Sequence, residues 1–333
     1  MINSIYLAIV LVSFCGVITC SNVVDYKGWT LYWSDEFNGT TLNSYWRAQN
    51  FAPSDGDNDN GELEFYLPRN CLFENGNLVM KSAREPYQGY NYTSCSIISK
   101  VGETYGRFEA RMKLPIGKGF WPAFWMLPES YTCKTYKEID IMENIGEAGD
   151  DEDPNIFATY HSGTSCDPQN HSNNGTWIPS FASDFHLYSV IWDVDYLVFM
   201  VDNIPYLTVN KTNSPNQIFP NDTPFIIILN VAVGGKWPGT PDNTTVFENN
   251  YGLVDFVRIY KRTNETSTTT TSATTSTTTT SSTTTTTDSI TTDGVTSSTS
   301  TSEPNNSLSK LFFINNTLNI LIVLIFLIFS YYL

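Results

Sequence analysis

The chain has 333 residues and is acidic, with 34 Asp and Glu against 18 Lys and Arg and a net charge of −16. Proteins that bind nucleic acid neutralise its phosphates with clustered Lys and Arg, so this composition argues against a nucleic-acid partner. A neutral polysaccharide fits the charge better. The length could hold two domains, but both ends have non-globular compositions, which leaves one domain between them.

Residues 1–20 are predicted to be a signal peptide. The stretch 5–18 is almost wholly apolar and Thr19, Cys20 and Ser21 follow it, although no basic segment precedes it. Such a run is too short to be a comfortable membrane span. We therefore expect a secreted protein whose globular domain covers residues 22–262.

The globular domain is expected to be all-β. Short runs rich in β-branched and aromatic residues alternate with Gly, Pro, Asn and Asp, and almost no helical periodicity is sustained. The clearest predicted strands are 78–82, 106–113, 188–192, 197–201, 225–233 and 253–260. Many strands at short spacing favour a β-sandwich of two antiparallel sheets, in which an open concave sheet would form a substrate groove.

Three carboxylates crowd into one predicted strand, residues 137–144. Because side chains change face at each step, Glu138 and Asp140 share a face, whereas Glu143 reaches it only if a β-bulge adds one residue at Ile141 or Met142. We predict that bulge. The α-carbons of Glu138 and Glu143 would then lie roughly 13 Å apart at about 3.3 Å per step, within reach of one bond through their side chains.

Paired carboxylates are the machinery of a retaining glycosidase. One attacks the anomeric carbon while the other, about 5–5.5 Å away, protonates the leaving oxygen and then activates water. Asp140 between them would raise the proton affinity of a neighbour and keep it protonated near neutrality. No cofactor is expected for this chemistry. The alternative, a solvated acidic strand or a calcium site, is disfavoured because like charges on one strand face destabilise a sheet.

Cysteines and glycosylation sequons agree with an oxidising, secretory route. Four cysteines follow the signal peptide, and of three possible pairings we favour Cys71 with Cys95 and Cys133 with Cys166 for their short loops. The spacing lacks a CxxC, which argues against zinc. Sequons in the globular part begin at Asn38, Asn91, Asn170, Asn174, Asn210, Asn221 and Asn243.

Two further segments follow the globular domain. Residues 263–304 are nearly all Thr and Ser, which is typical of an O-glycosylated, extended stalk. Residues 305–333 contain an apolar run from Leu318 to Leu333 after small polar residues, a pattern that predicts a GPI-attachment signal. A transmembrane helix is the alternative. Either would place the protein at the cell surface, attached to a membrane, and we expect a monomer.

Several segments carry a resemblance to a known family. They are 33–37 (WSDEF), 60–63 (NGEL), 105–111 (YGRFEAR), 121–128 (WPAFWMLP), 138–143 (EIDIME), 229–235 (LNVAVGG) and 254–258 (VDFVR). In their order and content they resemble glycoside hydrolase family 16, specifically the laminarinase-like endo-1,3-β-glucanases. The spacing of two residues between Asp140 and Glu143 resembles the laminarinase branch, whereas lichenases and xyloglucan-active members have one.

The resemblance implies a β-jelly-roll sandwich and retaining hydrolysis of β-1,3-glucan, with Glu138 as nucleophile and Glu143 as acid/base. It also implies that Trp121 and Trp125 line the groove, and that Asn60, Arg107 and His161 hydrogen-bond sugars. Trp237 is a further stacking candidate, because aromatic rings bind the apolar faces of sugars. A weaker implication is a structural calcium at Asp255, away from the groove.

Two rivals remain at this point. A noncatalytic glucan-binding protein could use the same sandwich, but it would be free to lose the three acids that this chain keeps. A transglycosylase, in which an acceptor sugar replaces water, would keep the same acids. Mixed-linkage 1,3(4)-β-glucan is also an open alternative to a strict β-1,3 substrate.

Overall fold

The computed structural model describes residues 25–53, 60–130, 135–147, 155–165, 170–221 and 223–263. The predicted signal peptide, stalk and C-terminal segment lie outside these residues, as do Cys133 and Cys166. Among the described residues, no helix is long and apolar enough to cross a membrane. A short 3-10 helix, η2 (Pro68–Asn70), precedes the strand that begins at Cys71.

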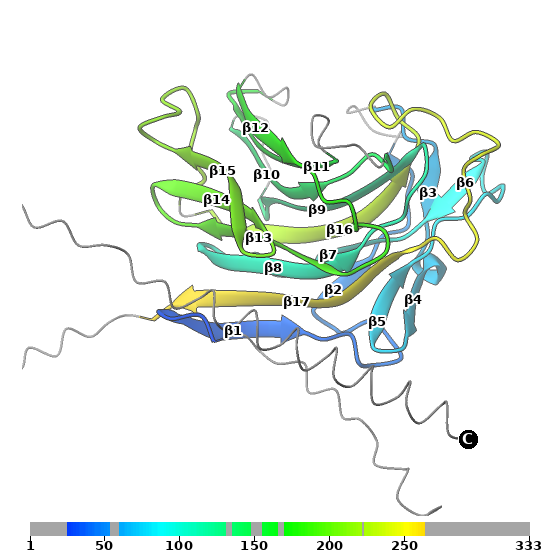
Figure 1. Ribbon diagram of the computed structural model, residues 1–333, viewed down its shortest axis with the longest axis horizontal. Coiled ribbons are helices and arrows are strands. Elements are labelled where there is room, and N and C mark those ends of the chain that lie inside the picture. The colour runs from blue at the N-terminus through cyan, green and yellow to red at the C-terminus, as the bar shows by residue number, and fades with distance from the viewer. Residues whose placement is uncertain are drawn as a thin grey trace, which may run out of the picture. The chain divides into compact units, whose positions relative to one another are not determined.

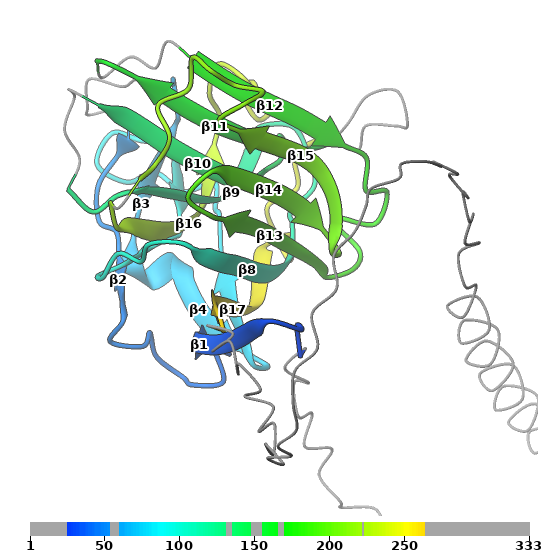
Figure 2. The same cartoon turned by 90° about the vertical axis from the view of Figure 1, so that its left-hand side faces the viewer.

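Two antiparallel sheets make up the domain, as Figures 1 and 2 show. The first, sheet A, has eight strands: β15 (Ile204–Asn210), β14 (Tyr196–Val201), β13 (His186–Trp192), β8 (Gly106–Lys113), β17 (Gly252–Arg262), β5 (Asn77–Met80) and β4 (Cys71–Glu74) in order, with β1 (Trp29–Asp35) paired to β17. The second, sheet B, has seven: β12 (Asn170–Thr176), β11 (Ile156–Gly163), β10 (Tyr136–Glu143), β9 (Phe120–Pro128), β16 (Phe225–Val233), β7 (Ser96–Ser99) and β2 (Trp46–Ala48). A small parallel pair, β3 (Glu64–Tyr66) and β6 (Tyr92–Ser94), lies beside them.

The core lies between the two sheets and follows the alternation of the strands. Phe108 on β8 faces inward from sheet A, and Phe124 on β9 and Leu229 on β16 face inward from sheet B, all fully buried. Each predicted strand is present within two residues of its expected ends. Trp46 and Trp192 are buried in this core, and Trp33 is partly buried against it. The predicted all-β sandwich is therefore confirmed.

The predicted bulge on β10 is also confirmed. Pairing with β9 runs from Asp140 opposite Trp125 to Met142 opposite Phe124, so the register shifts by one residue at Ile141. Ile141 and Met142 are both fully buried in the core. Because two successive residues point inward, Glu143 returns to the outer face.

The disulfide predicted between Cys71 and Cys95 is present, with a Cα–Cα distance of 5.1 Å. It links β4 in sheet A to the residue between β6 and β7, and its sulfurs lie in the core. The second predicted disulfide, between Cys133 and Cys166, stays a prediction because both residues lie outside the described part.

Removing this cross-link should destabilise the domain. The two cysteines are 24 residues apart, and a loop of that size restricts the unfolded chain by about 3 kcal/mol. We expect the double variant Cys71→Ala/Cys95→Ala to lose about that free energy of unfolding in urea titrations without reductant. An unchanged unfolding midpoint would contradict a structural role for the bond.

Candidate active site

The three carboxylates meet on the outer face of sheet B. Glu138 and Asp140 alternate with the buried Ile139, and the bulge adds Glu143 to their face. Asp140 is 3% exposed, and Glu138 and Glu143 are partly exposed. The strand that carries all three acids, β10, lies between β9 and β11 in sheet B.

Each carboxylate has a specific neighbour. The Tyr136 hydroxyl donates to Oε2 of Glu138. The indole N–H of Trp121 donates to Oε1 of Glu143 at 3.0 Å. Nε2 of His161 lies 2.9 Å from Oδ2 of Asp140.

Burial keeps protons on this cluster. Desolvation raises the pKa of Glu143 to about 7, with a further increase from the charge of Glu138. It raises the pKa of Glu138 to about 8, and the charge of Asp140 adds to that increase. The pKa of Asp140 is also raised, by burial and then by Glu143. Near neutrality the cluster therefore holds at least one proton that it can donate, which is what a general acid requires.

Aromatic side chains surround the acids. Trp125 lies opposite Asp140 in the β9–β10 register, and Phe157 on β11 lies opposite Glu143. Trp237, 42% exposed, packs edge-on against Trp121 at 5.6 Å and against Phe157 at 5.1 Å. The predicted groups Trp121, Trp125 and Trp237 are thus brought to the acidic cluster.

The residue before the Gly61 turn lies near these aromatics. Asn60 is exposed, and its carbonyl accepts a hydrogen bond of 2.7 Å from the Lys236 backbone N–H. That bond ties its segment to the loop that carries Trp237. The structure places Asn60 beside the site, at the edge of the aromatic group.

A buried chain of hydrogen bonds fixes the Trp125 ring. Its indole N–H donates to Oδ1 of Asn230 at 2.7 Å, and the Asn230 amide donates to the Tyr66 hydroxyl at 2.9 Å. Tyr66 in turn donates to the carboxyl group of Glu64, which also accepts the Val233 N–H at 2.7 Å. Burial raises the pKa of Glu64 to about 8. Asn230 lies in the LNVAVGG motif, but the sequence predicted no role for Asn230, Tyr66 or Glu64.

The prediction for Arg107 is wrong. Arg107 lies on β8, and because its neighbour Phe108 faces the core, it points from the outer face of sheet A, across the sandwich from the acids. It is buried there against Glu109 at 2.8 Å and Asn203 at 2.6 Å, under the ring of Tyr26. A YGRFEAR pattern identifies the strand but does not reveal which sheet faces the substrate.

The role predicted for His161 also changes. The residue does lie in the cluster, on β11 opposite Glu138. Its Nε2 contacts Asp140, however, and its Nδ1 lies 2.6 Å from Nδ1 of His171. The Asp140 contact is not a hydrogen bond, because Oδ2 of Asp140 has no hydrogen-bond partner among the described residues. Both ring nitrogens of His161 nevertheless face protein groups rather than a sugar hydroxyl. His171 lies inside the Asn170 sequon, and the sequence alone assigned it no role.

Asp255 does not fit a calcium site. Its carboxylate accepts a hydrogen bond of 2.7 Å from the Arg111 guanidinium on the outer face of sheet A. Calcium requires six to eight oxygen ligands, and a cationic partner on the only candidate carboxylate opposes it. Among the described residues, the one group of three close side chains with ligand atoms is Glu138, Asp140 and His161, which is the acidic cluster itself.

Comparison with known proteins agrees with this geometry. The model of glycosyl hydrolases family 16 matches residues 40–251. The glucan endo-1,3-beta-glucosidase A1 of Niallia circulans is 34% identical over 268 residues, covering 70% of this chain but 38% of that relative. The beta-glucanase of Rhodothermus marinus is 32% identical, covering 70% of this chain and 85% of that relative.

A solved structure has the same architecture. The laminarinase catalytic domain from Thermotoga maritima aligns with a TM-score of 0.62 and 36% identity, covering 71% of this chain and 99% of that one. The family match covers the acidic cluster and every strand of the two sheets except β1 and β17. The chain belongs to glycosyl hydrolases family 16.

Proposed function

We propose that this protein is a retaining endo-hydrolase of β-1,3-glucan. The observation that carries the proposal is the bulged strand, which brings Glu138, Asp140 and Glu143 to one face with raised pKa values. The names of the relatives, a glucan endo-1,3-beta-glucosidase, a beta-glucanase and a laminarinase, support β-1,3-glucan as the substrate.

Glu138 and Glu143 share one proton in the reactive form, and in the first step that proton is on Glu143, so that ionised Glu138 attacks the anomeric carbon and forms a covalent bond to the sugar. The bond from that carbon to the leaving oxygen breaks, and protonated Glu143 gives its proton to that oxygen. In the second step Glu143, now ionised, takes a proton from water, and the resulting hydroxide displaces Glu138. Two inversions give overall retention, and the side chains supply the chemistry without a cofactor.

The neighbours of the acids serve these steps. The Tyr136 hydroxyl stabilises charge on Glu138, and the Trp121 N–H fixes the orientation of Glu143. Apolar sugar faces stack on indole rings, so Trp121, Trp125 and Trp237 can hold the glucan across the acids. Asn60, exposed beside them, is a candidate to hydrogen-bond sugar hydroxyls.

The two rivals are less well supported. A noncatalytic glucan-binding protein has no need for three crowded carboxylates, one buried and two partly buried, whose desolvation costs free energy of folding. A transglycosylase would use the same covalent intermediate and is separated from a hydrolase only by its acceptor. The products released from linear β-1,3-glucan and from mixed-linkage glucan distinguish strict β-1,3 cleavage from 1,3(4)-β-glucan cleavage.

We further propose a secreted glycoprotein held at the cell surface. The apolar stretch 5–18, the seven sequons and the Ser/Thr-rich residues 263–304 support this location. The apolar segment from Leu318 to Leu333 supports membrane attachment through a GPI anchor, with a transmembrane helix as the alternative.

Activity tests the proposal directly. Purified protein incubated with linear β-1,3-glucan, mixed-linkage glucan and xyloglucan should release short β-1,3 oligomers with new reducing ends. Glu138→Gln should lower kcat by about 10⁴-fold or more while glucan binding persists, because the nucleophile is lost at constant side-chain size. Longer products without new reducing ends would indicate transglycosylation, and full activity of Glu138→Gln would refute the mechanism.

The raised pKa of the acid predicts the alkaline side of the pH profile. Since the reaction needs one proton on the pair and the pKa values of Glu143 and Glu138 are about 7 and about 8, kcat/KM on glucan should fall as pH rises through this range and the pair loses its last proton. An aryl β-glucoside oligomer whose leaving group needs no proton should keep its first-step burst above that pH. A fall already centred near 4.5, the ordinary value for glutamate, would contradict burial as the cause.

The hydrogen-bond chain behind Trp125 predicts a binding defect. Tyr66→Phe removes the hydroxyl between Asn230 and Glu64, so the Trp125 ring loses its fixed orientation. We expect KM for glucan to rise about three- to tenfold with little change in kcat. The reason is that a ring on which a sugar stacks binds the substrate equally well in the ground state and in the transition state. Tyr45→Phe, whose hydroxyl donates to Val101 away from the site, is the matched control. Equal KM values for the two variants would contradict this role.

A further inference from the structure

His171 lies at the end of a chain of side chains that reaches Asp140. On β12 it is directly opposite His161 of β11, and the two Nδ1 atoms are 2.6 Å apart. The rings meet edge-on, with centroids 4.7 Å apart. The other nitrogen of His161 contacts Asp140 at 2.9 Å. An exposed histidine is thereby connected through one ring to the most buried acid of the cluster.

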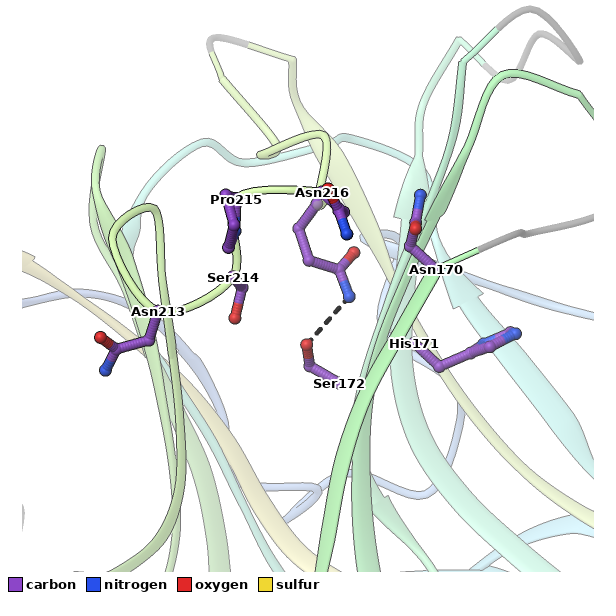
Figure 3. Close-up of a pocket in the computed structure, with 8 residues that line it drawn as sticks. Asn170, His171, Ser172, Asn213, Ser214, Pro215 and Asn216 are labelled. Carbon is purple, nitrogen blue, oxygen red and sulfur yellow. Dashed lines mark hydrogen bonds between the residues drawn. The ribbon is translucent and has the colours of Figure 1, made fainter.

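The face of β12 that carries Ser172 is held by hydrogen bonds from Gln217. Gln217 donates to the Ser172 hydroxyl at 2.9 Å and accepts from the Ser162 hydroxyl of β11. These contacts border a pocket of about 460 Å³ between β12 and residues 213–217. Figure 3 shows His171 on the side of β12 away from that loop. The anchoring fixes β12 and so the position of the His171 ring.

Only one proton can occupy the contact between the two Nδ1 atoms. If His171 donates it, neutral His161 carries its own proton on Nε2, and this N–H group, 2.9 Å from Oδ2 of Asp140, favours the ionised carboxylate electrostatically. If His161 donates instead, its Nε2 is bare, and the lone pair that then faces Asp140 favours a protonated carboxyl group. The tautomer of His161 and the protonation of Asp140 are therefore linked.

We propose that His171 is a positioning residue for the hydrolase reaction, whose Nδ1–H holds His161 in the Nε2–H tautomer and thereby keeps Asp140 ionised. The inference rests on the proposed function. The charge of Asp140 lies between Glu138 and Glu143 on the strand face and opposes ionisation of both. Loss of the His171 donor would weaken that charge, and Glu143 would release its proton at lower pH.

The titratable neighbours of the histidine pair among the described residues come from two strands. From β10 they are Tyr136, Glu138, Asp140 and Glu143. From β15, which packs against β12, Tyr206 is the titratable residue, and burial raises its pKa far above the working range. No described Lys or Arg forms a salt bridge with the two histidines or the three acids.

Tautomers are measured first, without any assay of activity. The chain has three histidines, so ¹⁵N spectra of the labelled protein can be assigned with His186→Gln, on β13 of the other sheet, and His171→Gln. We expect neutral His161 protonated on Nε2 and neutral His171 protonated on Nδ1. A proton on Nδ1 of His161, with a bare Nδ1 on His171, would overturn the proposal whether or not the protein cleaves glucan.

Variants then test the consequence for catalysis. His171→Phe keeps a ring but removes the donor, and kcat should fall about tenfold, the factor for one lost orienting hydrogen bond. The alkaline limb of kcat/KM should also move to lower pH. His171→Gln supplies a side-chain N–H and should restore much of both, and each variant keeps the Asn170-x-Ser172 sequon.

Comparing wild type with His171→Phe and His171→Gln separates the hydrogen bond that His171 donates from the packing or charge of its ring. Equal pH limbs for wild type and His171→Phe would overturn the proposal, as would a His171→Gln variant no better than His171→Phe. His186→Gln, remote from the site, should leave the limb in place. If no variant or wild type cleaved any glucan, the proposed function would fail, while the tautomer result would still decide the hydrogen-bond assignment.

Discussion

The bulge in β10 is the constraint on which the rest of the site depends. A regular strand would turn Glu143 into the core, where Met142 now packs. The extra inward residue moves the acid to the outer face at the cost of an interrupted ladder. Burial of both Ile141 and Met142 in the apolar core offsets that cost. Core packing on one face of the strand therefore determines the catalytic geometry on the other.

Once the acids share a face, their environment determines how they behave. Asp140 is buried and the other two acids are partly buried, and desolvation is the largest cause of each raised pKa. Neutral donors, the Tyr136 hydroxyl and the Trp121 indole, stabilise charge where it is needed without adding a permanent cation. A Lys or Arg at the same distance would hold its carboxylate ionised and remove the acid. The site thus combines low polarity with a few oriented dipoles, as acid/base chemistry requires.

Much of this could be read from the sequence because it is local. Strand positions, the bulge and the Cys71–Cys95 bond follow from alternation and spacing over short stretches. What could not be read depends on which distant strands become neighbours. His171 is opposite His161 only because β12 pairs with β11, and Tyr66 supports Trp125 only through Asn230, 164 residues away in sequence. Arg107 was misplaced for the same reason, since a motif locates a strand without stating which sheet it joins.

The charges on the two outer faces show independently which sheet carries the function. On sheet A, the guanidinium groups of Arg107, Arg111 and Arg258 are each paired with a carboxylate: Glu109, Asp255 and Glu36. Each carboxylate in these pairs is neutralised by a guanidinium group, so these acidic residues stabilise the fold. On sheet B, the three carboxylates have only His161 as a basic partner among the described salt bridges. Desolvated like charges without balancing cations destabilise a fold. Such charges occur on the outer face of sheet B, whereas the carboxylates on sheet A are neutralised, and this contrast indicates that sheet B carries the catalytic site.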